Sequence, residues 1–405
     1  MIPLILKDFR QMAAIALCVL FASLTFSTAL VEITFGAALV FWLLLRIQTK
    51  RLIPQSIPAY AWPLAGFVLW CALSILWSEA RPQSIRGFFK IAQQVMLFWM
   101  AAELLRGSSR RRFANVFLIV LAVVVFDGLI QYFFGRDFIR GFAPPHSSAG
   151  FRITASFKTY GLLATWLIMT LPFLLFLGLR WRNHERSAPQ WYLTMPVFTF
   201  GLLILILTRS RGAFLALVCG TFLMLIAHRK FIWIALFSVL VCATVALLPH
   251  AMVIHLDITN KEQSIVERLS LWNRAWDVVA ARPVTGTGIN TYAAVHERYD
   301  KTKDWRVRGY YAHNGYLQVA AETGMTGLGL FLLFLVLFLR HTILKIKRRP
   351  NLWDRAAGYG LLAGIFNFLL LTAVDTVMHN QQSVMAFWFL LGTLNSYAED
   401  GLPHG

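Results

Sequence analysis

Arginines recur around one histidine in the second half of the sequence, and this combination points to acid–base chemistry on an anionic substrate. Arg209 and Arg211 stand two apart in "TRSRGA" (208–213), directly before an apolar run. Planar guanidinium groups bind phosphate through two parallel hydrogen bonds, and a helix N-terminus near Gly212 would add its dipole. We predict that both arginines bind phosphate; anchoring to lipid headgroups is the alternative.

Three further arginines fall on or just after a predicted amphipathic helix, "IVERLSLWNRAWDVVA" (265–280). Its apolar residues lie three or four positions apart, so the helix is expected to rest on a membrane surface or to cap a cavity. These apolar residues of the predicted helix are Val266, Leu269, Trp272, Trp276 and Val279. The candidate phosphate ligands are Arg268, Arg274 and Arg282. Pairing with a nearby acid is the alternative for two of them, because Glu267 precedes Arg268 and Asp277 follows Arg274.

A Pro/Gly loop, "RPVTGTGIN" (282–290), comes next. Its glycines are expected to let backbone N–H groups approach a ligand closely. The aromatic residues Trp272 and Trp276 are expected at the level of the lipid headgroups.

"HNGY" (313–316) supplies the candidate catalytic residue. Histidine titrates near neutral pH, and neighbouring arginines would keep the imidazole of His313 uncharged and ready to accept a proton. A histidine at the membrane interface, bonded to Asn314 or to a backbone carbonyl, is the alternative. The candidate supporting residues are Asn314, Tyr310 and Tyr311. Glu322 and Asp375 are expected to be structural partners of the arginines.

The composition determines what must position these residues. The chain of 405 residues is 58% hydrophobic and only 14% charged, whereas soluble domains have about 25% charged residues. Its mean hydropathy is +0.61. The cysteines Cys18, Cys71, Cys219 and Cys242 fall inside apolar blocks, so they predict neither disulfides nor a metal site. We therefore predict an all-α, polytopic integral membrane protein.

The apolar blocks predict about twelve transmembrane helices. They run over 12–30, 33–47, 59–77, 88–105, 113–134, 158–179, 191–207, 211–227, 231–248, 315–340, 356–374 and 381–397. Transmembrane helices one to nine would occupy residues 1–248, one large outer loop with the amphipathic helix 249–312, and helices ten to twelve 313–405. The two arginines of "TRSRG" cannot lie in hydrocarbon, so they break the long apolar stretch 191–227.

Basic loops predict the orientation. Clusters such as "RGSSRRR" (106–112) and "RHTILKIKRR" (340–349) fall in one alternating set of loops, which we expect to be cytoplasmic together with both termini. About half of the 38 Lys and Arg residues nevertheless fall on the outer side. A long loop can be translocated regardless of its charge, but Arg209 and Arg211 lie in a short hairpin. An anionic ligand on the outer face is therefore the favoured explanation.

Three segments carry a resemblance to a known family: "LTRSRGAFLAL" (207–217), "ERLSLWNRAW…RPVTGTGINTY" (267–292) and "HNGYLQVAAETGMTGLGLFL" (313–332). They resemble the O-antigen ligase/polymerase superfamily, and the chain is most similar to its lipopolysaccharide O-antigen ligases. The resemblance implies a GT-C-like membrane fold and a glycosyltransferase at the periplasmic face of the Gram-negative inner membrane. That enzyme would move O-antigen glycan from undecaprenyl pyrophosphate to lipid A–core oligosaccharide.

The resemblance also implies roles for individual residues. The family's essential histidine falls on His313, an arginine before a helix on Arg209 or Arg211, and its loop arginines among Arg268, Arg274 and Arg282. No Asp-x-Asp pair of the kind that holds a divalent ion stands out, which favours an inverting, metal-independent mechanism with guanidinium groups as charge stabilisers. Apart from membrane lipids, donor and acceptor, no cofactor, nucleic acid or obligate protein partner is expected.

Other functions compete with this interpretation. An O-antigen polymerase or a protein O-oligosaccharyltransferase of the same superfamily would use the same chemistry on another acceptor. A transporter or flippase for an anionic lipid is the alternative from another class. A transporter would favour charged residues deep in several helices. The predicted helix centres here are nearly bare of them, with Asp127 close to the outer end and Gln93 and Gln94 as weak exceptions.

Overall fold

The computed structural model describes residues 2–50, 57–147, 150–178, 191–227, 237–239, 259–301 and 311–399. Its elements are α1 (Ile2–Ser23), α2 (Thr28–Thr49), α3 (Ala61–Leu73), α4 (Arg81–Leu104), α5 (Ser108–Phe134), β1 (His146–Ser147), β2 (Gly150–Phe151), α6 (Tyr160–Gly178), α7 (Trp191–Leu207), α8 (Arg211–Ala227), α11 (Thr259–Ala281), α12 (Tyr292–Tyr299), α13 (Gly315–Lys347), α14 (Leu352–Thr372), the 3-10 turn η1 (Val377–His379) and α15 (Gln381–Glu399). The predicted all-helical class is confirmed, apart from the short antiparallel hairpin of β1 and β2.

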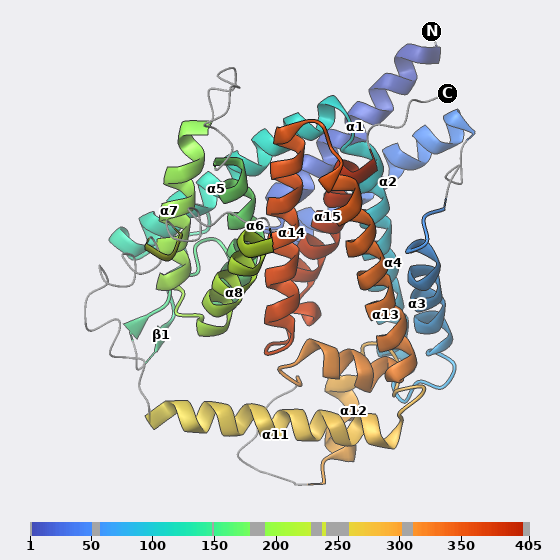
Figure 1. The fold of residues 1–405 in the computed structure, drawn as a ribbon. Coiled ribbons are helices and arrows are strands. Elements are labelled where there is room, and N and C mark those ends of the chain that lie inside the picture. The colour runs from blue at the N-terminus through green and yellow to red at the C-terminus, as the bar shows by residue number, and fades with distance from the viewer. Residues whose placement is uncertain are drawn as a thin grey trace.

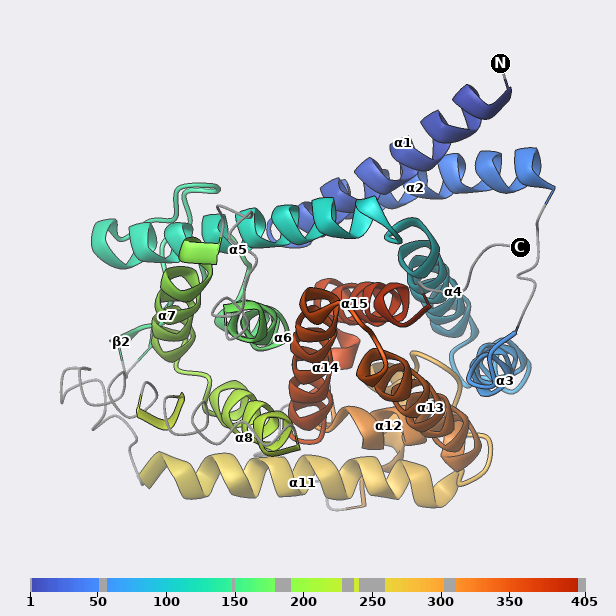
Figure 2. The same cartoon turned by 45° about the horizontal axis from the view of Figure 1, so that its top comes forward.

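The helices form an upright bundle that is closed at one end by a crossing helix. In Figure 1, α3, α4, α13, α14, α6, α7 and α8 stand roughly side by side, and α11 lies across their lower end. Figure 2 shows α1, α2 and α5 along the flank farthest from α11. The first helix begins at the end of the bundle that lies away from α11 (Figure 1). We call the two ends the α11 end and the opposite end.

The helices follow the predicted apolar blocks closely. Each block inside the described residues forms a helix, whereas most of the block at 231–248 lies outside them. Of the described helices, α2, α5, α6, α13 and α14 are long and apolar enough to cross a membrane, and α3, α7 and α8 are shorter apolar helices. The total of about twelve spans, the domain limits and the orientation stay predictions.

One predicted boundary is wrong. The first apolar block was expected over 12–30, but α1 already ends at Ser23. The reason is a capping interaction: the side chain of Ser27 accepts a hydrogen bond from the N–H of Leu30 at 3.3 Å, so α2 begins at Thr28, five residues before the second block expected from residue 33.

Close backbone contact joins α6 and α14 at the centre of the bundle. A β-carbon at Gly364 would lie 2.0 Å from the carbonyl oxygen of Met169, and one at Gly360 would lie 2.6 Å from the Cα of Phe173. Helices in a membrane gain little from the hydrophobic effect and associate by such close packing of small residues. These glycines therefore fix α14, whose C-terminal end carries part of the site described below.

The α11 end depends on a kink in α13 at Gly324, where φ is 71° and ψ is 176°. Only glycine adopts this backbone region readily. The kink lets the 282–290 loop pack against α13: the N–H of Met325 donates to Pro283 O at 2.8 Å, and the N–H of Gly288 donates to Glu322 O at 2.9 Å. A β-carbon at Gly324 would lie 2.0 Å from the carbonyl oxygen of Val284.

Gly324→Ala should therefore destabilise the protein by more than about 2 kcal/mol, because it adds both backbone strain and a clash with main-chain atoms. Gly329→Ala is the matched control on the same helix, since a β-carbon there meets nothing within 4 Å. The measurement is the thermal unfolding midpoint of the purified protein in detergent. Equal midpoints for the Gly324→Ala variant and the wild type would contradict this account of the kink.

Candidate active site

His313 directly precedes α13 at the α11 end, and three elements hold its backbone. Its φ of 48° is uncommon for a residue other than glycine. The side chain of Asn314 caps α13 by accepting a backbone hydrogen bond from the first turn at 3.1 Å. The N–H of Gly315 donates to Asp375 O at 3.2 Å, and the indole N–H of Trp272 on α11 donates to His313 O at 3.1 Å. Trp272 is thus bonded to the site's backbone, and its position at the headgroup level stays a prediction.

The imidazole of His313 faces a carboxylate. Its Nδ1 lies 3.2 Å from Asp375 Oδ1, and both side chains are part-exposed. Burial raises the pKa of Asp375, but the hydrogen bonds from His313 and the Thr376 N–H, with the positive charges of His313 and Arg268, lower it more. The pKa of this carboxyl therefore lies below its ordinary value, so Asp375 is ionised at neutral pH.

This pair has the arrangement of a general base with an orienting carboxylate. If Nδ1–H donates to Asp375, Nε2 of His313 carries the free lone pair and can accept a proton, and the carboxylate stabilises the imidazolium that forms. Asp375 was expected to be a structural partner of the arginines; it interacts electrostatically with Arg268 and also contacts His313. Glu322 does not pair with an arginine through its described contacts; it accepts the backbone N–H groups of Asn290 at 2.7 Å and Tyr292 at 3.3 Å.

The predicted break between α7 and α8 is confirmed, and it places Arg209 and Arg211 beside the same helix end. Arg209 has a φ of 56°, and its Nη1 is buried without a hydrogen-bond partner among the described residues. Arg211 is exposed at the first position of α8. A β-carbon at Gly212 would lie 3.8 Å from Val374, the residue before Asp375. The arginine turn therefore lies next to the C-terminal end of α14.

Arg152 was not among the predicted site residues, yet the structure brings it to Arg209. The N–H of Ile153 donates to Leu207 O at 3.2 Å, which ties this loop to the end of α7. Burial and the charge of Arg152 both lower the pKa of Arg209. Arg152 lies over the ring of Tyr160 at 4.4 Å, and its Nε is buried without a hydrogen-bond partner in the described part of the chain. Two guanidinium groups held this way favour an anion between them.

The α11 arginines divide into two groups. Arg268 acts electrostatically on Asp375. Arg274 instead forms an ion pair with Asp300 at 2.6 Å, and both side chains are less than a tenth exposed. Arg282 is 55% exposed and lies 3.7 Å from Glu79. The latter two arginines thus attach α11 to α12 and to the loop before α4, and a phosphate contact by either one remains a prediction.

One expectation for this region needs correction. The glycine loop uses backbone N–H groups internally: those of Gly286, Thr287 and Gly288 donate to Arg282, Ala321 and Glu322. Of the apolar stripe of α11, Val266, Leu269 and Trp276 are at least half exposed, whereas Val279 is buried; its contact with a membrane surface stays a prediction. The buried positions are Leu271, Arg274, Ala275, Val278 and Val279. Sequence periodicity missed this face because a buried arginine lies in its middle.

The remaining predicted residues have mixed outcomes. The ring of Tyr311 lies 4.4 Å from that of His379. Tyr310 falls outside the described residues. Among the described residues, no three His, Cys, Asp or Glu side chains gather as metal ligands would.

The fold and the site define a class: an integral membrane protein of apolar helices with a histidine–carboxylate pair beside arginines suited to an anionic substrate. Residues 196–332, about a third of the chain, match the family model described as O-antigen ligase. This similarity supports membership of the O-antigen ligase/polymerase superfamily and a glycosyltransferase-like membrane enzyme. The matched segment contains Arg209, Arg211, α11 and His313. Comparison with curated proteins gave no match.

Asp375→Asn should reduce glycosyl transfer by about 10²–10⁴-fold, because the imidazolium loses its carboxylate and the base its orientation. The measurement is the initial transfer rate at neutral pH, where Asp375 is ionised.

Asp277→Asn is the control, since this α11 carboxylate contacts the solvent-exposed Lys301 at 3.5 Å. It should leave the transfer rate near wild type. A near-normal rate for Asp375→Asn would contradict the role given to this carboxylate.

Proposed function

We propose that the chain is an inverting, metal-independent glycosyltransferase that moves O-antigen glycan from undecaprenyl pyrophosphate to lipid A–core oligosaccharide. The reaction takes place at the periplasmic face of the Gram-negative inner membrane. The observation that carries the proposal is the contact of His313 with Asp375 at the end of α14, next to the turn with Arg209 and Arg211. The family match of residues 196–332 supports the same class of reaction.

In the proposed reaction, a hydroxyl of the acceptor sugar approaches the anomeric carbon of the donor glycan. His313 Nε2 takes the hydroxyl proton as the new carbon–oxygen bond forms, and Asp375 stabilises the resulting imidazolium. The bond from the anomeric carbon to the phosphate oxygen breaks in the same step, which inverts the anomeric centre. Undecaprenyl pyrophosphate leaves with the bonding electrons.

The leaving group needs charge stabilisation more than a proton. A pyrophosphate ester is a weak base, and guanidinium groups keep their charge and fork geometry at neutral pH. We assign this role to Arg209, Arg211 and Arg268, as the sequence predicts, and add Arg152 because of its position beside Arg209. Arg274 and Arg282 act in this proposal by holding α11 in place through Asp300 and Glu79.

The proposed orientation follows from charge. Basic loops such as 106–112 lie at the opposite end of the bundle and would face the cytoplasm, with both termini. The α11 end, with its large loop, would face the periplasm, where α11 lies across the ends of the upright helices (Figure 1). Transfer assays with lipid A–core, with a lipid-linked repeat unit and with a protein acceptor distinguish the ligase from the polymerase and from the protein oligosaccharyltransferase.

His313→Ala should abolish transfer while leaving binding of the polyprenyl donor largely intact, because it removes the base and no phosphate ligand. The measurements are transfer by the purified chain and donor binding by the same preparation. His341→Gln, at the opposite end of the bundle, is the control for loss of a histidine. Near-normal transfer by His313→Ala would refute the assignment of the base.

Arg209→Gln should raise the donor KM about 10- to 100-fold, since a hydrogen bond to a charged group contributes about 1.5–3 kcal/mol. It should leave the melting temperature unchanged or higher, because it removes a partly buried charge held beside Arg152. Arg298→Gln is the matched control on the same end; Arg298 is 65% exposed and lies 3.8 Å from Glu79. A lower melting temperature with an unchanged donor KM would show that Arg209 is structural.

A further inference from the structure

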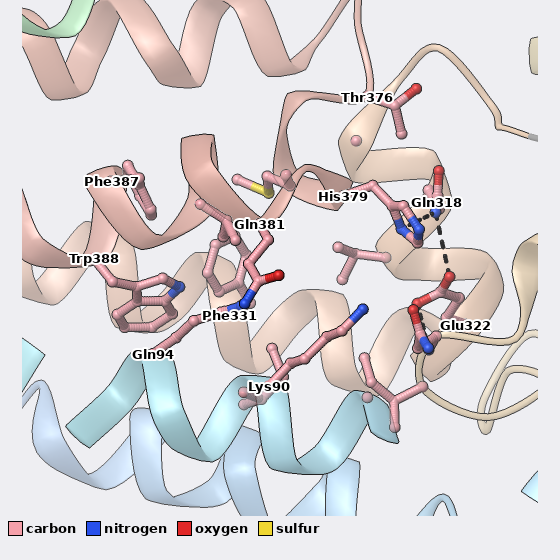
Figure 3. Close-up of a pocket in the computed structure, with 18 of the residues that line it drawn as sticks. Lys90, Gln94, Gln318, Glu322, Phe331, Thr376, His379, Gln381, Phe387 and Trp388 are labelled. Carbon is pink, nitrogen blue, oxygen red and sulfur yellow. Dashed lines mark hydrogen bonds between the residues drawn. The ribbon is translucent and has the colours of Figure 1, made fainter. Parts of the chain in front are cut away.

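A pocket next to the histidine–carboxylate pair has no role in the chemistry described so far. It lies between α3, α4, α13, η1 and α15 and encloses about 920 Å³ including its open mouth. Figure 3 shows aromatic side chains such as Trp388 on one side and the polar group of Gln318, Glu322 and His379 on the other, with Lys90 reaching between them.

Two buried amides of this lining have unused acceptor atoms. Gln94 and Gln318 are only 6% and 4% exposed, and the Oε1 of each has no hydrogen-bond partner among the described residues. The amide of Gln318 is oriented by its nitrogen, which lies 3.0 Å from His379 Nδ1 and 3.3 Å from Glu322 Oε1 (Figure 3). A buried carbonyl without a donor costs about 1–3 kcal/mol, so these positions favour a ligand that donates hydrogen bonds.

The donor requirement distinguishes between ligand chemistries. Ionised phosphate offers only acceptor oxygens, which would face these amide carbonyls and the carboxyl group of Glu322 unfavourably. Sugar hydroxyls donate as well as accept, and they match amides on one side and the Lys90 ammonium on the other. Burial, and then the charge of Lys90, lower the pKa of His379 to about 4. This imidazole is therefore neutral near pH 7 and adds no positive charge to attract an anion.

The pocket and the catalytic pair share their backbone. Gly315 and Thr376 line the pocket, two residues after His313 and one residue after Asp375. The arginine turn instead packs through Gly212 against Leu371 and Val374 of the α14 end. In an in-line displacement, the acceptor hydroxyl attacks the anomeric carbon from the side opposite the leaving group. A pocket and a phosphate site on different flanks of the α14 end fit this geometry.

We infer that this pocket binds the sugar end of the acceptor glycan, with Gln94 and Gln318 accepting hydrogen bonds from its hydroxyls. Identification of the ligand as the acceptor substrate rests on the proposed function, whereas the preference for a hydroxyl-rich saccharide rests on the pocket alone. Gln94 comes from α4, outside the segment that matches the family model.

The first test uses calorimetry to measure saccharide binding to the full chain in lipid nanodiscs. The probes are the deacylated, dephosphorylated core oligosaccharide and, in a parallel arm, the repeat-unit saccharide; undecaprenyl phosphate is the competitor. Gln94→Leu should weaken binding of the saccharide by about two- to tenfold, the value of one neutral hydrogen bond. Thr376→Val tests the part of the pocket wall next to Asp375. The Oγ1 of Thr376 is also buried and has no hydrogen-bond partner among the described residues. Gln83→Leu, on α4 but not among the pocket's lining residues, should bind as wild type does.

The second test is steady-state transfer, in which Gln94→Leu should raise the KM of the acceptor by the same factor and leave that of the donor unchanged. Gln318→Leu is the confirming variant; it also loses the bonds to His379 and Glu322, so its melting temperature is measured first. Unchanged saccharide affinity in Gln94→Leu, or displacement of the saccharide by undecaprenyl phosphate, would overturn the inference. If saccharide binding responds as expected but no transfer from the lipid-linked donor occurs, the pocket assignment stands and the proposed function fails.

Discussion

The junction between the end of α14 and the start of α13 is the interaction on which the site depends. Asp375 contributes to it twice: its backbone carbonyl accepts the N–H of Gly315, and its side chain meets Nδ1 of His313. The same helix end receives the turn with Arg209 through Gly212. Because one short backbone segment orients both the base and the cationic turn, their relative positions vary little. Proton transfer and charge stabilisation both require that precision.

Arginines contact acids at both ends of the bundle, as Arg274 contacts Asp300 at the α11 end, but Arg209 and Arg152 are held beside each other. At the opposite end, Arg110 contacts Asp354 at 3.3 Å, and Arg46 contacts Glu103 at 2.6 Å. At the α11 end, Arg209 and Arg152 are close enough for one to lower the pKa of the other, and each keeps a buried nitrogen without a hydrogen-bond partner among the described residues. A like-charged pair opposes folding, so it is more readily understood as part of a binding site than as a structural support.

The sequence predicted those features that depend on local pattern. Apolar runs predicted the described helices, and the two arginines of "TRSRG" predicted the break between α7 and α8. It did not predict that Asp375 meets His313 or that Arg152 meets Arg209, since 62 and 57 residues separate the members of these pairs and only tertiary packing unites them. A signal for Asp375 was present, however: it is an acid directly after an apolar run, in a chain poor in acids. The packed face of α11 was missed because Arg274, buried against Asp300, interrupts its apolar period.

Backbone strain marks the same places independently of side-chain chemistry. Five non-glycine residues of the described chain have positive φ: Lys50, Ala155, Arg209, Asn290 and His313. Lys50 is the C-cap of α2, where this conformation is ordinary. The other four lie in the loop of Arg152, in the arginine turn, in the pocket wall and at the base itself. Each such residue costs about 1–3 kcal/mol and persists only where surrounding contacts determine it. They coincide with the proposed base, the proposed phosphate site and the pocket, so the fold gives up stability where the proposed two-substrate displacement would need three groups fixed in one geometry.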